Sequence, residues 1–431
     1  MLRSLLAALN VRPEEQIQVV MMLTIGFFMG TFIATFSVTA ESLFLSQLSN
    51  QLNNAFLVAG ILGIVSTVLF SFFQNKVKFS SLTIACMFLV IASVTVVYVL
   101  YRFGPREVHA EVLFAMYCLT GPVTAILLLC YWGIFGRLFN FKQSKRIIGW
   151  IDTGQLIAQI LAFFFIPLSA AFFPDTSDYL LVCNASILGA SVCMVIIAYK
   201  FPLIKNDPSE FDETVVKETT FGKILRDPYT RLLALFLIIS MVTYIFTQYS
   251  FQTLVNTQYP DQKELASFLA YFNGAIYGLS LIMQTFVNDK ILSNYGIKLS
   301  MFILPILVSF FAIVASVIGI FVGYDPILSP TTFIFFFLTV ALMRLFNMMI
   351  RDSLENPCLQ ATIHPARQPV QVQHPGKARG CGKRVGTIPG RSYDLRIRVS
   401  SHFQDVLDHS SDYCTRCLLH IGNQELIHGL S

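Results

Sequence analysis

The chain has 431 residues, of which 55% are hydrophobic and only 13% are charged, and its formal net charge is +5. In soluble domains about a quarter of the residues are charged. This composition therefore excludes a single soluble core and indicates a polytopic helical membrane protein. The small net charge gives no support for a nucleic-acid partner, and we predict none. The partner that the composition implies is the lipid bilayer.

Ten apolar stretches of membrane-spanning length follow a short amphipathic lead-in. In the lead-in, residues 1–15, leucines recur at helical spacing beside Arg3 and Arg12, which predicts a segment at the cytoplasmic surface. The predicted fold class is therefore all-α. The predicted spans are residues 17–40, 55–73, 82–101, 112–133, 148–172, 180–199, 232–251, 265–287, 299–322 and 331–350.

The spans form two groups around a polar connection. Residues 201–230 are rich in Asp, Glu and Lys, and a long loop between two groups of spans is the plan of a two-half transporter. A short motif after the second span, residues 73–77, recurs after the eighth span as residues 286–291. We predict an N-terminal six-helix bundle at 1–200, a cytoplasmic central loop at 201–230, a truncated C-terminal bundle of four spans at 231–352, and an anomalous, disordered tail at 353–431.

The distribution of basic residues predicts the orientation of the chain. If the N-terminus is cytoplasmic, every inside loop has a base, whereas the outside loops hold only Arg102, Arg106 and Lys263. This bias follows the positive-inside rule and predicts a cytoplasmic N-terminus. The inside bases are Arg3, Arg12, Lys76, Lys78, Arg137, Lys142, Lys145, Arg146, Lys200, Lys205, Lys217, Lys223, Arg226, Arg231, Lys290, Lys298 and Arg351.

The fifth span carries a polar face. Asp152, Gln155 and Gln159 repeat at three and four residues and therefore share one side of a helix. Unsatisfied polar groups in hydrocarbon cost several kcal/mol each, so this side does not point to lipid. We predict a wet or protein-facing stripe that shapes a substrate path. The alternative is that Asp152 sits near the interface and caps the helix start.

Two charged residues are further candidates for binding a substrate. Arg344 lies inside the tenth span, where a charge usually faces a cavity or a partner, although snorkelling to the interface is the alternative. Glu41 ends the first predicted span and is either a binding residue or a simple interface acid. Four amides in spans seven and eight either line a pathway or hydrogen-bond between helices, and for any single one we favour the second role. These amides are Gln248, Gln252, Asn273 and Gln284.

No pattern in the sequence supports an enzyme, a cofactor or a metal site. The chain has neither a phosphate-binding Gly loop followed by Lys and Ser/Thr nor a helix with paired His and Glu metal ligands. Cys414 and Cys417 have metal-ligand spacing, but no second pair follows them, and a structural zinc site needs four ligands. We therefore predict that the protein is not an enzyme.

Three groups of motifs in residues 2–357 carry a family resemblance. They are Glu41-Ser42-Leu43-Phe44-Leu45, then Ser144-Lys145-Arg146-Ile147-Ile148-Gly149, and then residues 227–229, 259–261, 268–272 and 304–305. In this order, they resemble the end of the first helix, the entry to the fifth helix and the opening of the second half in the nucleotide-translocase (ATP/ADP antiporter-like) branch of the major facilitator superfamily. The family's translocases carry a basic residue just before the first acid, where this chain has Ala40.

The resemblance implies a major-facilitator helix bundle, with ten spans present of an expected twelve, in a bacterial inner membrane. Together with the two-half plan it predicts a secondary transporter of small organic anions, with nucleotides as one candidate class, that works by alternating access. Arg344 would attract the anion, while Glu41, Asp152, Gln155 and Gln159 would shape its path. The alternative is a membrane-embedded sensor or scaffold that transports nothing, which the absence of a basic residue in the first span favours.

The end of the chain departs from the pattern of the rest. After Pro357 the hydrophobic periodicity stops, and six of the seven His residues fall there. A disordered basic tail is one interpretation. The other is translation in a shifted frame, because a shift of one nucleotide can give a segment that resembles the one following the family's tenth helix. We predict a frameshift near Pro357 and Cys358, two further spans in the true product, and an unstable or inactive 431-residue form.

Overall fold

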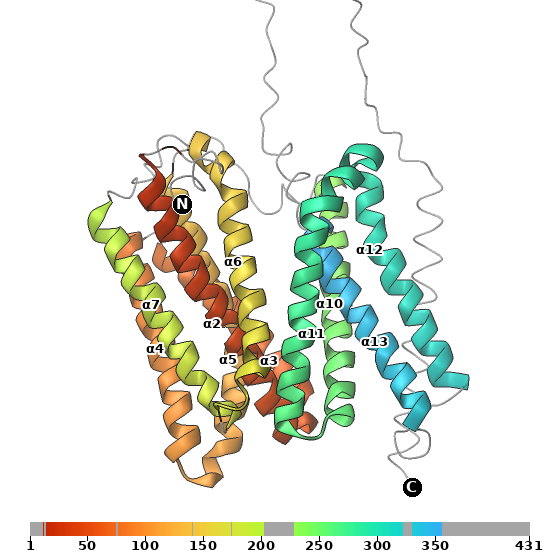
Figure 1. Ribbon diagram of the computed structural model, residues 1–431. Helices are drawn as coiled ribbons and strands as arrows, with labels where there is room; N and C mark the ends of the chain where they lie inside the picture. Colours follow the sequence, from red (N-terminus) through yellow and green to blue (C-terminus); the bar gives the residue numbers. More distant parts are fainter. Residues whose placement is uncertain are drawn as a thin grey trace, which may run out of the picture. The chain divides into compact units, whose positions relative to one another are not determined.

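Figure 1 shows the computed structural model, whose described regular elements are all helices. The structure describes residues 12, 14–74, 76–139, 141–173, 175–201, 228–321 and 330–355. The predicted lead-in, except for residues 12, 14 and 15, lies outside these ranges, as do most of the central loop and the tail with its predicted frameshift.

Six described helices precede the central loop, and they match the first six predicted spans. They are α2 (Gln16–Leu48), α3 (Leu52–Gln74), α4 (Phe79–Phe103), α5 (His109–Leu138), α6 (Phe141–Ser169) and α7 (Tyr179–Lys200). Three short 3₁₀ turns connect some of them: η1 (Ser49–Gln51), η2 (Arg106–Val108) and η3 (Thr176–Asp178).

Four more of the described helices follow the central loop, at the positions of the last four predicted spans, and two of them are continued by π-helical turns. They are α10 (Pro228–Gln258), α11 (Gln262–Ile282), α12 (Asn288–Phe321) and α13 (Pro330–Ile350), with π turns η5 (Met283–Val287) after α11 and η6 (Arg351–Glu355) after α13. A kink in α12 falls at Gly296, whose φ of 75° is a conformation that L side chains rarely adopt.

The described helices have the length and composition of membrane spans. Nine apolar stretches of the described residues are long enough to cross a bilayer, and one of them, Gln16–Gln74, contains both α2 and α3. The predicted ten spans are therefore present as ten helices of the described part of the chain. The protein is an all-α polytopic membrane protein.

Helix α2 is surrounded by other helices of the first group. It packs against α5, α6 and α7, and its buried residues include Phe32, Phe36 and Phe44. Small residues allow the close approach to α6, because a Cβ on Gly30 would lie 2.7 Å from the backbone oxygen of Gln155. A helix that is apolar on all sides is expected in such a central position.

Helix α11 connects the second group of helices to the first. It packs against α6 and α2, and the rings of Phe163 and Tyr277 stack with their centroids 5.4 Å apart. Within the second group, α13 packs against α10, α11 and α12. These contacts bring polar side chains of α2, α10 and α13 into one buried cluster.

Candidate functional site

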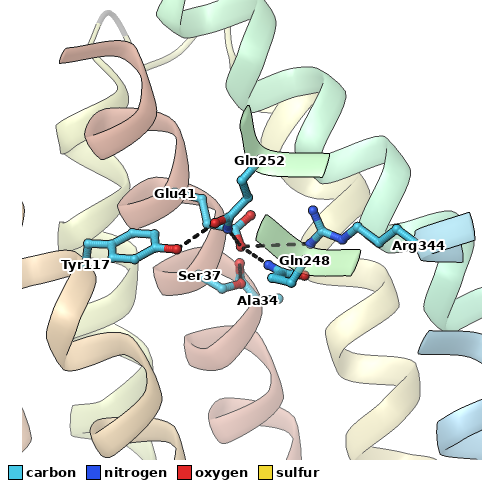
Figure 2. Close-up of polar contacts among 7 residues, drawn as sticks. All are labelled: Ala34, Ser37, Glu41, Tyr117, Gln248, Gln252 and Arg344. Carbon is cyan, nitrogen blue, oxygen red and sulfur yellow. Dashed lines mark hydrogen bonds and ion pairs between the residues drawn. The ribbon is translucent and has the colours of Figure 1, made fainter. Parts of the chain in front are cut away.

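A polar cluster joins three helices around the carboxylate of Glu41 on α2 (Figure 2). Its Oε1 accepts hydrogen bonds from Nε2 of Gln252 at 2.8 Å and from Nε2 of Gln248 at 3.1 Å, both on α10. Nη2 of Arg344, on α13, lies 3.9 Å from the same oxygen. Tyr117 of α5 extends the cluster, because its hydroxyl donates to Oε1 of Gln252 at 2.7 Å.

The position of Glu41 corrects the prediction that it ends the first span. Helix α2 continues to Leu48, because Leu43, Phe44 and Leu45 are buried and stay helical beyond the acid. Figure 2 shows Glu41 on the same helix as Ser37. The Ser37 hydroxyl donates to the Ala34 carbonyl at 3.0 Å within the helix. Among the described residues, the hydrogen-bond and ion-pair partners of Glu41 come from α10 and α13.

Arg344 does not snorkel to the interface. It is buried, with 2% of its surface exposed, which excludes the interface position that was the alternative for this residue. The centre of its guanidinium lies 4.2 Å from the ring centroid of Phe251 and 5.7 Å from that of Phe272. These aromatic faces help to stabilise a desolvated cation.

Four buried atoms of the cluster have no hydrogen-bond partner among the described residues. They are Oε2 of Glu41, Oε1 of Gln248, and Nε and Nη1 of Arg344. An unsatisfied buried polar group costs about 1–3 kcal/mol, and more for a charged group, so such atoms require an explanation. The cluster therefore presents two acceptors and two donors that a bound molecule could satisfy.

The predicted stripe on α6 lies elsewhere in the structure. Gln155 and Gln159 are buried, and a Cβ on Gly30 of α2 would lie 3.2 Å from Cγ of Gln159. Gln284 of η5 is a polar neighbour of the Asp152 carboxylate. Helix α6 begins at Phe141, so the alternative that Asp152 caps its start is wrong.

The structure thus brings together only two of the five predicted site residues. Glu41 and Arg344 meet, whereas Asp152, Gln155 and Gln159 share no hydrogen bond or ion pair with them in the described part of the chain.

Sequence reasoning missed Tyr117 and two aromatic rings of the site. Tyr117 lies in an apolar run, and nothing in that run distinguishes it from a packing residue. Phe251 and Phe272 likewise look like lipid-facing or core residues. The sequence did indicate the two amides of the site, because Gln248 and Gln252 are four residues apart and share a face of an apolar helix.

Comparison with protein-family models finds no match, and comparison with curated proteins finds none either. Solved structures do match. The nucleoside transporter NupG is 15% identical with a TM-score of 0.52, over 81% of this chain and 84% of that chain. A D-xylose-proton symporter is 12% identical with a TM-score of 0.51, over 80% and 81% of the two chains.

The inward-open xylose transporter XylE from E. coli also matches, with 12% identity, a TM-score of 0.50 and coverage of 80% of this chain and 81% of that chain. This chain has the major-facilitator fold. At these identities the major-facilitator likeness concerns the fold alone, and the nucleotide-translocase branch that the sequence resembles stays a prediction.

Proposed function

We propose that this protein is a secondary transporter that works by alternating access and binds its substrate at Glu41, Gln248, Gln252 and Arg344. The observation that carries the proposal is a partly buried acid, Glu41, and a buried base, Arg344, which meet across helices of the two groups and keep atoms without a partner among the described residues. Ionisable residues inside a membrane protein are costly and usually mark a substrate or ion pathway.

The proposed substrate is a small organic anion that also carries hydrogen-bond donors. Nε and Nη1 of Arg344 would bind a carboxylate or phosphate group, which guanidinium groups bind with good geometry. Oε2 of Glu41 and Oε1 of Gln248 would accept from a hydroxyl or amine of the same molecule. Because Glu41 offsets the charge of Arg344, an anion without donors would leave a carboxylate oxygen unsatisfied. Hydroxy acids, amino acids and nucleotides meet this requirement.

The positions of these residues on two groups of helices support alternating access. Glu41 is on α2, whereas Arg344 is on α13, so one bound molecule would contact both groups of helices. Rocking of the two groups about a fixed site is the usual mechanism of such transporters. We propose that the α6 stripe of Asp152, Gln155 and Gln159 shapes the path, that the N-terminus is cytoplasmic, and that the membrane is a bacterial inner membrane.

Uptake into proteoliposomes tests the proposal. The panel is AMP, lactate and glutamate as donor-bearing anions, with xylose and uridine as neutral compounds. We expect accumulation of at least one of the anions, and loss of it in Arg344→Met at a preserved yield of folded protein. Arg102→Met is the matched control, because Arg102 pairs with Asp175 at an exposed position outside the site.

Two outcomes would contradict the proposal. If none of the five compounds enters the vesicles, a membrane-embedded sensor or scaffold becomes the better interpretation. The absence of any Lys or Arg from α2 is the observation that favours this second candidate. If Arg344→Met lowers folded yield and uptake equally, Arg344 is structural.

A further inference from the structure

A second buried polar cluster lies where α13 continues into the π turn η6. Nη2 of Arg351 donates to the Ser240 hydroxyl of α10 at 3.0 Å, and that hydroxyl donates to Oε1 of Glu355. Arg351 has 8% of its surface exposed and Glu355 has 2%. One turn away, Nδ2 of Asn347 donates to the Thr247 hydroxyl at 3.2 Å.

This cluster repeats the chemistry of the Glu41–Arg344 site. Its atoms without a partner among the described residues are Oε2 of Glu355, Nη1 of Arg351 and Oδ1 of Asn347. The first site has the same three kinds of unpartnered atom: a carboxylate oxygen, a guanidinium nitrogen and an amide oxygen. In both sites the guanidinium also lies over an aromatic ring, with Arg351 4.7 Å from the ring centroid of Tyr244.

The two sites are aligned along one face of α13 and its continuation η6. Arg344, Asn347 and Arg351 are spaced three and four residues apart, which places them on the same side of the helix. Seven residues of helix rise correspond to about 10.5 Å, so the second site is two turns farther along. The π turn is itself a feature that occurs often at functional sites.

A purely structural role does not account for the second cluster. Buried charged groups that only hold helices together are usually satisfied by hydrogen bonds, because each unsatisfied charge is costly. Here the arginine, the glutamate and the asparagine each keep one buried atom without a partner. All three are at least nine-tenths buried, and their unpartnered atoms include both donor and acceptor types.

We infer that Arg351, Glu355 and Asn347 form a second binding position for a small anion that carries hydrogen-bond donors, at the η6 end of α13 and two turns beyond the first site. For the class of ligand, this inference rests on the proposed function. A molecule leaving Arg344 would exchange one set of guanidinium, carboxylate and amide groups for an equivalent set two turns away.

Equilibrium binding of radiolabelled AMP to the full chain in lipid nanodiscs tests the inference. We expect two AMP molecules per chain in the unmodified protein and one in Arg351→Met. Arg351→Lys keeps the positive charge but removes the planar guanidinium group with its paired N–H donors. It should therefore weaken the second binding event about tenfold or more without loss of folded protein. Arg102→Met should bind as the unmodified protein does.

The outcomes separate this inference from the proposed function. If Arg351→Met and Arg351→Lys bind AMP with unchanged stoichiometry and affinity, or if the unmodified protein binds no AMP, the second site is overturned. If Arg344→Met binds as the unmodified protein does while Arg351→Met loses one AMP, the second site stands and the first site is misassigned.

Discussion

At the scale of single residues, Glu41 has the most connections between helices in the candidate site. Its carboxylate contacts two amides of α10 and the guanidinium of α13, so it contributes both to packing and to the charge balance of the site. The distance of 3.9 Å to Arg344 is long for an ion pair, and it leaves both groups able to bind a third molecule.

A double-mutant cycle measures how strongly the two charges are coupled. Glu41→Gln keeps hydrogen-bonding capacity but leaves Arg344 as an uncompensated buried cation, so the free energy of unfolding should fall by about 2 kcal/mol or more. In Arg344→Met the same Glu41→Gln change should cost less, with a coupling of about 1–3 kcal/mol. Reversible unfolding in mixed detergent micelles gives these values. Additive effects would show that the pair does not interact.

At the scale of helices, sequence periodicity predicted the existence of every described span but not their ends. Hydropathy identified the apolar run up to Ala40, while α2 continues to Leu48 because the helix beyond Glu41 is covered by other helices. The number and order of spans follow from apolar length, which is local. Which polar side chains meet depends on contacts between helices that are far apart in sequence. Such contacts cannot be predicted from the apolar pattern of a single sequence.

Contacts between helices also explain why α2 carries glycine where it faces α6. A Cβ on Gly30 would lie 2.7 Å from the Gln155 carbonyl oxygen, so Gly30→Ala should lower the free energy of unfolding by about 1–3 kcal/mol. Gly60 of α3 is the matched control, because a Cβ there meets nothing within 4 Å. Gly60→Ala should be neutral or stabilising by about 0.5–1 kcal/mol. Equal effects of the two changes on thermal stability would contradict this account of the α2–α6 contact.

At the scale of the whole molecule, the two groups of helices differ in how their first helix is packed. Helix α2 packs against α5, α6 and α7, whereas α10 packs mainly against α13 among the described residues. Large side chains of α10 are correspondingly exposed, including Ile238 at 60% and Phe246 at 58%. The two further spans that the sequence analysis predicts would provide partners equivalent to α6 and α7, and they stay a prediction.

The central claim is that Glu41 and Arg344 form one site that opens to each side of the membrane in turn. Ser37 lies near Glu41 in Figure 2, so Ser37→Cys places a small reactive group beside the site with little change in volume. The measurement is the rate at which a charged, membrane-impermeant thiol reagent modifies this cysteine from either side of proteoliposomes, with and without AMP. The unmodified protein gives the background from natural cysteines such as Cys86 and Cys193. We predict modification from both sides, slowed by AMP on both. Modification from one side only, or no protection by AMP, would contradict the claim.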